Sequence, residues 1–447
     1  MRPMATPEDL VTLAELEDDP HPALARMRAA GPAVWVPALG SWMVTGYEAA
    51  VAVLRDARAF TVDDPRFSTA KVVGPSMLSL DGAAHARHRA PFNRAFRRDE
   101  VHARLAAFTQ VQAARLVAAI APDGAAELRR AVAGPLAAAV MAEVLGLGRV
   151  DPGRILAWYD GIVAAVQAEA AGAALPSGAA GAALQPEAAG AALQPEAAGA
   201  ALQPEAAVAA GPVGTTAFGE LAASLRQVIA ARESGSLLAE VALPPRAAGA
   251  ALQPEATGAA GPAAEAGLTA TEAISNAAVL LFGGIETTEG MIANALLHLL
   301  SSPAQLTRVI ADPGLVPAAV EESLRLEPAA AVVDRYATAA TRLGDAEIQA
   351  GDQVTVSIAG ANRDPAVFGD PDLFDVRRPN AGRQLAFAHG PHFCLGAHLA
   401  RLEAQIAVET ILIRLAGLRL DPRYPSAPRG LVFRKPPDLR TQWDAAS

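Results

Sequence analysis

The single cysteine of this 447-residue chain, Cys394, is the side chain whose chemistry is easiest to define from its neighbours. A lone cysteine cannot form a disulfide within its own chain. Gly390 and Gly396 flank it, and apolar residues recur at helical spacing from Leu395 to Ile406. We therefore expect Cys394 near the N-terminus of a helix, where peptide dipoles and free N–H groups favour a thiolate. Because the glycines permit close approach of a large flat group, this thiolate can be the axial ligand of haem iron.

Three other interpretations of the cysteine segment stay open at this point. A lone intracellular cysteine is commonly packed as a small hydrophobic side chain. A zinc site is conceivable, because His389, His392 and His398 lie close to Cys394 in the sequence. However, a typical zinc motif pairs two close ligands with a distant second pair. A nucleophilic cysteine would need a base and an orienting partner, and nothing nearby selects either.

A second unusual pattern lies inside a long predicted helix. Thr269 and Glu272 match a capping box, and the helical pattern continues to Leu300, just before Pro303. Roughly 30 residues at 1.5 Å per residue give a helix of about 45 Å, long enough to cross a whole domain. We expect this to be the central helix of the fold.

The middle of the central helix contains two adjacent glycines, Gly283 and Gly284. Each interior glycine costs about 1 kcal/mol relative to alanine. Glu286 and Thr287 follow them, so the pattern indicates a local widening with polar groups aimed at a ligand. The alternative is close helix packing, with Thr287 hydrogen-bonded back to its own turn.

Composition favours a mainly helical protein, because alanine is abundant and has the highest helix propensity. Residues 32–47 alternate like two short strands around a turn, which adds a small β-rich region. A net charge of −10 argues against a general nucleic-acid binder. We find no run of about 18 apolar residues and no signal-peptide pattern, so we expect a cytoplasmic protein without a membrane span.

Two alanine-rich tracts, residues 171–212 and 244–266, contain a repeat with a period of nine residues. Proline and glycine in every repeat interrupt any long helix. We interpret both tracts as low-complexity insertions in surface loops; the family resemblance given below implies that the first lies in the lid over the substrate site. The rest of residues 1–447 is then expected to form a single domain.

The segment 387–401 resembles the haem-binding signature of the cytochrome P450 superfamily, in particular its soluble bacterial members. Phe387, His392, Cys394 and Gly396 stand at matching positions, whereas His389 is less usual there. The resemblance implies that Cys394 is the iron ligand. Together with the segments described next, it runs in order from about residue 32 to residue 433, outside the two tracts.

The segment 283–288 looks like the oxygen-activation motif of the same family. The resemblance implies that Gly283 opens a groove for dioxygen, that Thr287 hydrogen-bonds the oxygen ligand, and that Glu286 relays protons. Glu286 replaces the commoner aspartate. In the alternative, Glu286 is a salt-bridged helix residue and Thr287 works through water alone.

Glu322 and Arg325 lie three residues apart on a predicted helix, so they share a face. By themselves they are an ordinary surface pair. The resemblance implies instead a buried structural pair beneath the haem, joined by Arg378, because a buried charge must be paired.

Basic residues that resemble the family's contacts to the haem propionates come from three segments. His85 and Arg89 are four residues apart on a predicted helix and point the same way. Arg335 and His392 match the other usual contacts. We expect the neighbouring His88 to lie at the surface.

The resemblance implies the cytochrome P450 fold, with haem b (iron protoporphyrin IX) buried between the central helix and the cysteine loop. It also implies a monooxygenase that hydroxylates or epoxidises a hydrophobic small molecule with dioxygen, plausibly in secondary metabolism. The apolar residues expected to line the substrate pocket are Val279, Phe282, Val332 and Val432. The alternatives are oxidative coupling or desaturation without oxygen insertion, and a non-catalytic haem-thiolate sensor.

No flavin, nicotinamide or iron–sulfur motif is found, so the electrons are expected from separate proteins, a ferredoxin and its reductase or an equivalent pair. Their docking face is expected on five arginines, despite the acidic total charge. These are Arg87, Arg94, Arg97, Arg98 and Arg383. We expect the protein itself to be a monomer.

Overall fold

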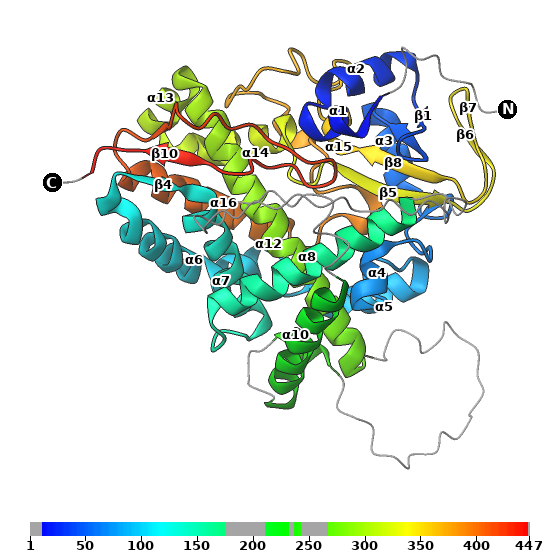
Figure 1. The fold of residues 1–447 in the computed structure, drawn as a ribbon, viewed down its shortest axis with the longest axis horizontal. Helices are drawn as coiled ribbons and strands as arrows, with labels where there is room; N and C mark the ends of the chain where they lie inside the picture. Colours follow the sequence, from blue (N-terminus) through cyan, green and yellow to red (C-terminus); the bar gives the residue numbers. More distant parts are fainter. Residues whose placement is uncertain (1–10, 175–210, 232–236, 243–266, 446–447) are drawn as a thin grey trace, which may run out of the picture.

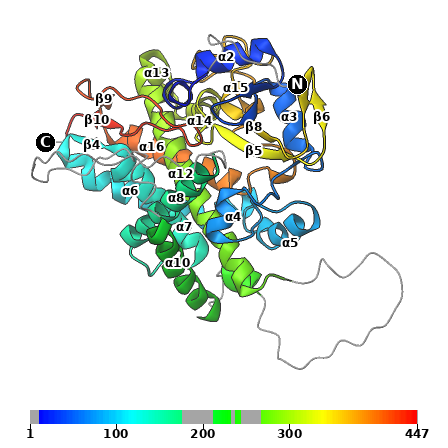
Figure 2. The same cartoon turned by 45° about the vertical axis from the view of Figure 1, so that its right-hand side comes forward.

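A computed structural model describes residues 11–174, 211–231, 237–242 and 267–445. Helices make up most of this part of the chain, which also contains three small sheets and the loops that connect these elements. The prediction of a mainly α-helical fold with a small β-rich region is therefore confirmed. The central helix α12 (Ala270–Ser301) runs through the middle of the helical part, and the largest sheet lies to one side of it (Figures 1 and 2).

The helices before the first tract and after it are as follows. The first group is α1 (Leu13–Asp18), α2 (His21–Ala30), α3 (Tyr47–Arg55), α4 (Ser68–Val73), α5 (Gly82–Asn93), α6 (Arg98–Ile120), α7 (Gly134–Leu145) and α8 (Pro152–Ala174). The second group is α10 (Gly211–Ala231), α11 (Leu237–Val241), α12, α13 (Pro303–Ala311), α14 (Val316–Leu326), α15 (Ile358–Ala361) and α16 (Ala397–Arg414). The short turns are η2 (Ala121–Asp123), the π-helical η3 (Arg129–Ala133), η5 (Pro313–Leu315), η6 (Ala381–Arg383) and η7 (Gly390–His392).

The largest sheet has five strands in the order β1 (Val34–Val36), β2 (Ser41–Val44), β8 (Gln353–Ser357), β5 (Val332–Ala337) and β3 (Phe60–Thr61). Only the β2–β8 pair is parallel. A second sheet has the order β4 (Ala125–Glu127), β10 (Arg440–Gln442) and β9 (Arg419–Leu420), and β6 (Thr341–Leu343) pairs with β7 (Ala346–Ile348). The two short strands expected in residues 32–47 are thus β1 and β2.

The central helix begins where the sequence predicts, because Thr269 and Glu272 form the complete capping box. It continues through Gly283 and Gly284 without interruption and ends at Ser301, two residues before Pro303. Most of its residues are buried in the main apolar core, which it shares with α6, α7, α14 and α16. The helix therefore does not break at the two glycines, where the sequence predicted a local widening.

The ends of the first predicted insertion belong to regular structure, since α8 extends to Ala174 and α10 begins at Gly211. The remainder of residues 171–212 and the whole of 244–266 lie outside the described residues. The insertion and single-domain assignments stay predictions.

In the described part of the chain, one helix is long and apolar enough to cross a membrane by length and composition alone. It spans Arg98–Asp123 and contains α6. The sequence pattern did not predict this helix as a candidate, because its apolar residues do not form an uninterrupted run. In the fold α6 packs on α16 through residues at four-residue spacing, which is the pattern of a helix with one buried face. These residues are Val101, Leu105, Thr109, Ala113 and Val117.

A buried carboxylate, Glu327 at the end of α14, connects the N-terminal helices to the C-terminal segment. Its oxygens lie 2.7 Å from Nε of Arg434 and 2.9 Å from Nε2 of His21. Burial by itself would raise the pKa of Glu327. The hydrogen bond from His21 and the charges of His21, Arg434 and Arg363 outweigh burial and lower this pKa to about 2.

We predict that Glu327→Gln lowers the unfolding free energy by about 3 kcal/mol at neutral pH, because buried cations lose their counter-charge. The pKa of Glu327 in the fold lies below the ordinary 4.5. Its contribution is therefore complete above that pH and is lost as the pH falls toward about 2. Urea unfolding at several pH values should show a weaker acid dependence for the variant than for the wild type. Glu347→Gln on exposed β7 is the control, and equal stability of Glu327→Gln and wild type would contradict this account.

Candidate active site

Cys394 lies in a tight loop that ends at the N-terminus of α16. Its backbone N–H donates to the carbonyl of Phe387 at 2.8 Å, which closes the loop. Gly390 has a φ of +71°, and a Cβ there would lie 2.5 Å from the carbonyl oxygen of Leu54 on α3. Only glycine allows both the positive φ and the short distance to Leu54, so the loop contacts α3 closely at this residue.

The electrostatic surroundings of Cys394 differ from the sequence expectation. Its side chain is exposed, yet nearby protein removes enough water from the sulfur to raise the pKa of the thiol. The Gly396 N–H and the charges of Arg89 and Arg401 lower it, but less than burial raises it. The predicted stabilisation of a thiolate by the helix terminus is therefore outweighed in the protein alone. Coordination to a metal is a further way to favour the thiolate.

The zinc interpretation finds no support in the structure. Among the described residues, no group of three or more His, Cys, Asp or Glu side chains is arranged to hold a metal ion. His392 faces Asp81, at 2.7 Å between Nε2 and Oδ1.

The two adjacent glycines of α12, Gly283 and Gly284, have different environments. A Cβ at Gly284 would collide with the sulfur of Met141 on α7, so this glycine permits close helix packing. A Cβ at Gly283 would meet no atom within 4 Å. The Thr287 hydroxyl donates to the Gly283 carbonyl at 2.6 Å, the back-bonded arrangement that the sequence left open. Close packing thus explains Gly284, and open space remains beside Gly283.

Glu286 is a buried, salt-bridged residue of α12. Its Oε1 lies 2.9 Å from Nζ of Lys435, which also lies 2.5 Å from Oε2 of Glu289 one turn further along the helix. Arg129 completes the cluster, with Nε 3.0 Å from Oε1 of Glu289, close enough for an ion pair although the N–H is not aligned for a hydrogen bond. The sequence raised the salt bridge as an alternative but gave no sign that Lys435 would be the partner.

Three of the four predicted propionate contacts carry cationic or polar nitrogens with few protein acceptors. Nε2 of His85 is buried and has no hydrogen-bond partner. Arg335 is 5% exposed, donates to the carbonyl of Asp334, and forms no ion pair within 4.0 Å among the described residues. Arg89 donates to the carbonyl of Phe393 at 2.6 Å. An unpaired buried guanidinium is costly, so this group of donors is suited to an anionic ligand.

His392, the fourth predicted contact, connects this group to Asp81. The His392 ring lies 4.4 Å from the ring of His85. Burial raises the pKa of Asp81, but hydrogen bonds from His392, Thr61 and the Val62 N–H lower it to about 2. Burial, followed by the charges of His392 and Arg89, lowers the pKa of His85 to about 4. Asp81 was missed by the sequence reasoning, although it directly precedes the helix that carries His85.

Two expectations about the helix α5 are wrong. His88 is not at the surface: it is 2% exposed, and its Nδ1 lies 3.0 Å from the side-chain nitrogen of Asn276 on α12. Arg87 is not a free docking residue, because it forms a bidentate ion pair with Glu272. Both residues contact α12, which lies almost 190 residues further along the chain.

The predicted support residues lie together. Glu322 and Arg325 are fully buried and form a bidentate ion pair, with both N···O distances 2.8 Å. Nε of Arg378 lies 2.9 Å from the same carboxylate. Phe387 is buried beneath the guanidinium of Arg401, 4.3 Å from its ring centre.

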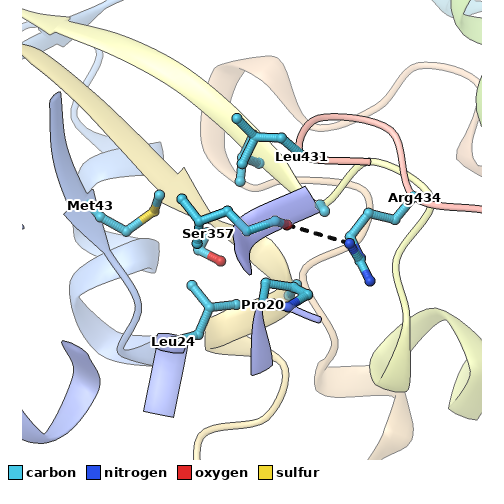
Figure 3. A pocket seen from close by; sticks show the side chains of 10 residues that line it. Pro20, Leu24, Met43, Ser357, Leu431 and Arg434 are labelled. Atoms are coloured by element: carbon cyan, nitrogen blue, oxygen red, sulfur yellow. Dashed lines mark hydrogen bonds between the residues drawn. The ribbon is translucent and has the colours of Figure 1, made fainter. Parts of the chain in front are cut away.

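The predicted pocket residues do not all share one environment. Val279, Phe282 and Val332 are buried, whereas Val432 is 43% exposed. The ring of Phe282 packs edge-on against Phe433 at 5.6 Å. Val332 also lines a small apolar cavity with residues of α1, α2, β2 and the C-terminal segment, including those labelled in Figure 3. That cavity holds no more than about one water molecule, so it is too small for a substrate.

Comparison with known proteins decides the family. The chain is 33% identical over 435 residues to the cytochrome P450 monooxygenase PikC of Streptomyces venezuelae, over 94% of this chain and 89% of that protein. The chain belongs to the cytochrome P450 family. The sequence model named Cytochrome P450 matches residues 256–417 of this P450.

Two further relatives of this P450 are informative. The 20-oxo-5-O-mycaminosyltylactone 23-monooxygenase of Streptomyces fradiae is 42% identical over 157 residues, which are 35% of this chain and 37% of that protein. The structure of cytochrome P450 CYP109Q5 from Chondromyces apiculatus superposes with a TM-score of 0.76 at 27% identity, over 98% of both chains.

The predicted family, fold and enzyme class are therefore confirmed: this P450 is a monooxygenase, an oxidoreductase. Membership implies a haem-thiolate cofactor, oxygen, a redox partner and a small-molecule substrate. The residues of this chain fit such a group. Within the described ranges, the chain offers a thiol for the iron, a glycine beside open space, an imidazole nitrogen without a hydrogen-bond partner, and guanidinium groups that form no ion pair with a carboxylate.

We predict that Gly390→Ala lowers haem content at least about tenfold, because the new Cβ forces the cysteine loop away from the Leu54 carbonyl. The ratio of haem absorbance to protein absorbance in the purified variant measures this. Gly382→Ala is the matched control, since a Cβ there meets nothing within 4 Å. Full haem content in Gly390→Ala would contradict the claim that contact with α3 sets the loop.

Proposed function

We propose that this P450 uses haem b to hydroxylate or epoxidise a hydrophobic small molecule of secondary metabolism, with electrons from a ferredoxin and its reductase. The observation that carries the proposal is the position of Cys394. Its loop leads directly into α16, which packs against α12, the helix that bears Gly283, Glu286 and Thr287. Haem ligated by a thiolate supplies the electron-rich iron at which dioxygen is cleaved.

The residues assigned to holding the haem come from four parts of the chain. Cys394 is the iron ligand, and Phe387 and Gly396 shape the surface on its side. Gly283 leaves room on the other side. His85, Arg89, Arg335 and His392 hold the propionates. Supporting this, Arg335 and His85 are buried with polar nitrogens that protein acceptors leave partly or wholly unsatisfied.

The assigned catalytic residues handle protons. The Thr287 oxygen gives its own hydrogen to the Gly283 carbonyl, so its lone pairs remain available to accept a hydrogen bond from a group beside the iron. Glu286 must exchange its bond to Lys435 for a bond to water before it can pass a proton toward Thr287. Lys435 therefore restrains the acid, and proton delivery requires this ion pair to loosen.

The substrate class follows from the proposed lining and from the relatives. Val279, Phe282, Val332 and Val432 offer only apolar surface, which suits a hydrophobic molecule. Two relatives, PikC and the tylactone 23-monooxygenase, are named monooxygenases, and the second is named for a glycosylated lactone. A large, mostly apolar natural product is the substrate that this combination favours.

The redox partner is proposed to dock on four exposed arginines, without Arg87, which is only 30% exposed and is held by two bonds to Glu272. They are Arg94, Arg97, Arg98 and Arg383. Basic residues of this kind attract an acidic electron carrier, and the rate of reduction should then fall with rising salt. We propose that the enzyme acts as a cytoplasmic monomer, without nucleic acid or membrane.

We predict that Thr287→Ala still consumes reductant but yields roughly 10–100-fold less product per electron and releases hydrogen peroxide, because the site loses the hydroxyl that would order proton delivery beside the haem. The assay uses any ligand that shifts the haem spin state. Thr307→Ala is the matched control: on exposed α13 its hydroxyl makes the same back-bond, to the Pro303 carbonyl at 2.9 Å. Unchanged product yield per electron in Thr287→Ala would refute the assigned role.

A further inference from the structure

A buried asparagine on α12, Asn276, joins three parts of the fold. It is fully buried, and its Oδ1 accepts a hydrogen bond from the backbone N–H of Met77 at 2.8 Å. Its Nδ2 donates to the Glu272 carbonyl at 2.7 Å and lies 3.0 Å from Nδ1 of His88. Met77 belongs to the loop of residues 74–80 between α4 and α5, so one side chain connects this loop to α12 and to α5.

These contacts fix the orientation of the asparagine amide. The Met77 N–H can only donate, so Oδ1 must face it, and the Glu272 carbonyl can only accept, so Nδ2 must face that side. His88 must then accept at Nδ1 and carry its proton on Nε2, which lies 3.5 Å from a carboxylate oxygen of Glu272. Asn276 therefore keeps its position only while the His88 ring is neutral.

The charges around His88 support the neutral ring. Arg87 places Nη2 3.1 Å from Nε2; both atoms carry hydrogen when Nδ1 accepts from Asn276, so this contact is not a hydrogen bond, and the cation disfavours a second proton on the ring. His85 lies on the same helix α5. From α12, Glu272 is the one acidic group beside it, and Glu240 on α11 is exposed. Burial first, and then the charge of Arg87, lower the pKa of His88, against the opposing effect of Glu272.

The loop of residues 74–80 packs against α12 about one turn before Val279 of the proposed substrate pocket, because the Met77 N–H is bonded to Asn276. Met77 is 6% exposed and belongs to the same apolar cluster as Val279 and Phe282. Gly74 lies so close to α12 that a Cβ there would be 3.1 Å from the Ser275 hydroxyl. Within the loop, Ser79 accepts from the Ser76 N–H, a local bond that gives the turn its shape but does not attach it to α12.

We propose that Asn276 is the positioning residue that fixes the 74–80 loop over the substrate pocket, and that neutral His88 holds Asn276 in the required orientation. Asn276 touches neither the reacting atoms nor the haem in this proposal. It determines how tightly the pocket closes on a ligand. The inference rests on the proposed function only for the statement that the loop borders the substrate site.

The first experiment compares two ligands that bind haem iron through the same imidazole nitrogen. Imidazole itself needs little of the pocket, whereas the phenyl ring of 4-phenylimidazole must fit between α12 and the loop. Asn276→Leu should weaken 4-phenylimidazole at least about tenfold relative to imidazole, because the Met77 N–H loses its acceptor and the loop loses this attachment to α12. Ser275→Ala, which changes the preceding residue, is the control and should preserve the ratio.

The second experiment needs no haem. Hydrogen exchange of peptides that cover residues 74–80 should speed up at least about tenfold in Asn276→Leu and stay within about twofold of wild type in Ser275→Ala. A second pair of variants tests His88. His88→Gln retains an acceptor and should preserve the wild-type protection, whereas His88→Phe cannot accept and should reduce it.

The outcomes separate the inference from the proposed function. If the wild type binds no haem, the proposed function fails, while hydrogen exchange still tests the positioning by Asn276. If Asn276→Leu keeps both the ligand ratio and the loop protection within about twofold of wild type, the positioning role is refuted. Should Asn276→Leu fail to fold, the His88 pair decides: equal protection in His88→Gln and His88→Phe would overturn the proposal.

Discussion

The ion pairs of the buried Glu322 carboxylate fix the position of the chain segment that leads into the Cys394 loop. This carboxylate is held by the guanidinium groups of Arg325 and Arg378 and by the N–H of Asp375. A buried carboxylate is tolerable only when it is paired in this way. Arg325 extends the connection to the chain before the cysteine loop through backbone carbonyls, namely those of Asn362, Pro371 and Leu373. Helix α14 and the segment 362–378 therefore form one unit.

The same helix also reaches the cysteine loop itself. Glu321, next to Glu322, pairs with Arg401 of α16, and the Arg401 guanidinium covers the ring of Phe387. The Phe387 carbonyl in turn accepts the Cys394 N–H. Two adjacent glutamates thus position the chain before the loop and the helix after it. The position of Cys394 depends on this scaffold, and the position of the proposed catalytic residues Glu286 and Thr287 depends on α12.

Local chemistry explains what could be predicted from the sequence. The capping box predicted the start of α12 correctly, because its two residues, Thr269 and Glu272, lie only three positions apart in the sequence. The family resemblance supplied the role of Cys394, which the sequence pattern alone left among several alternatives. Contacts between distant segments were not predictable. His88 is buried by Asn276, and Glu286 is paired with Lys435, partners separated by almost 190 and almost 150 residues that leave no periodic signal. Composition predicted a helical chain but not which face of α6 meets α16.

The central claim is that Cys394 binds haem iron as a thiolate. The most direct measurement is the absorption spectrum of the reduced carbon monoxide complex, recorded for the wild type and for Cys394→His. The account predicts that the wild type shows the long-wavelength Soret band specific to thiolate ligation. In Cys394→His, any haem that is retained should absorb at the shorter wavelength typical of a histidine ligand. A wild-type complex that lacks the thiolate band, or a variant that keeps it, would contradict the account.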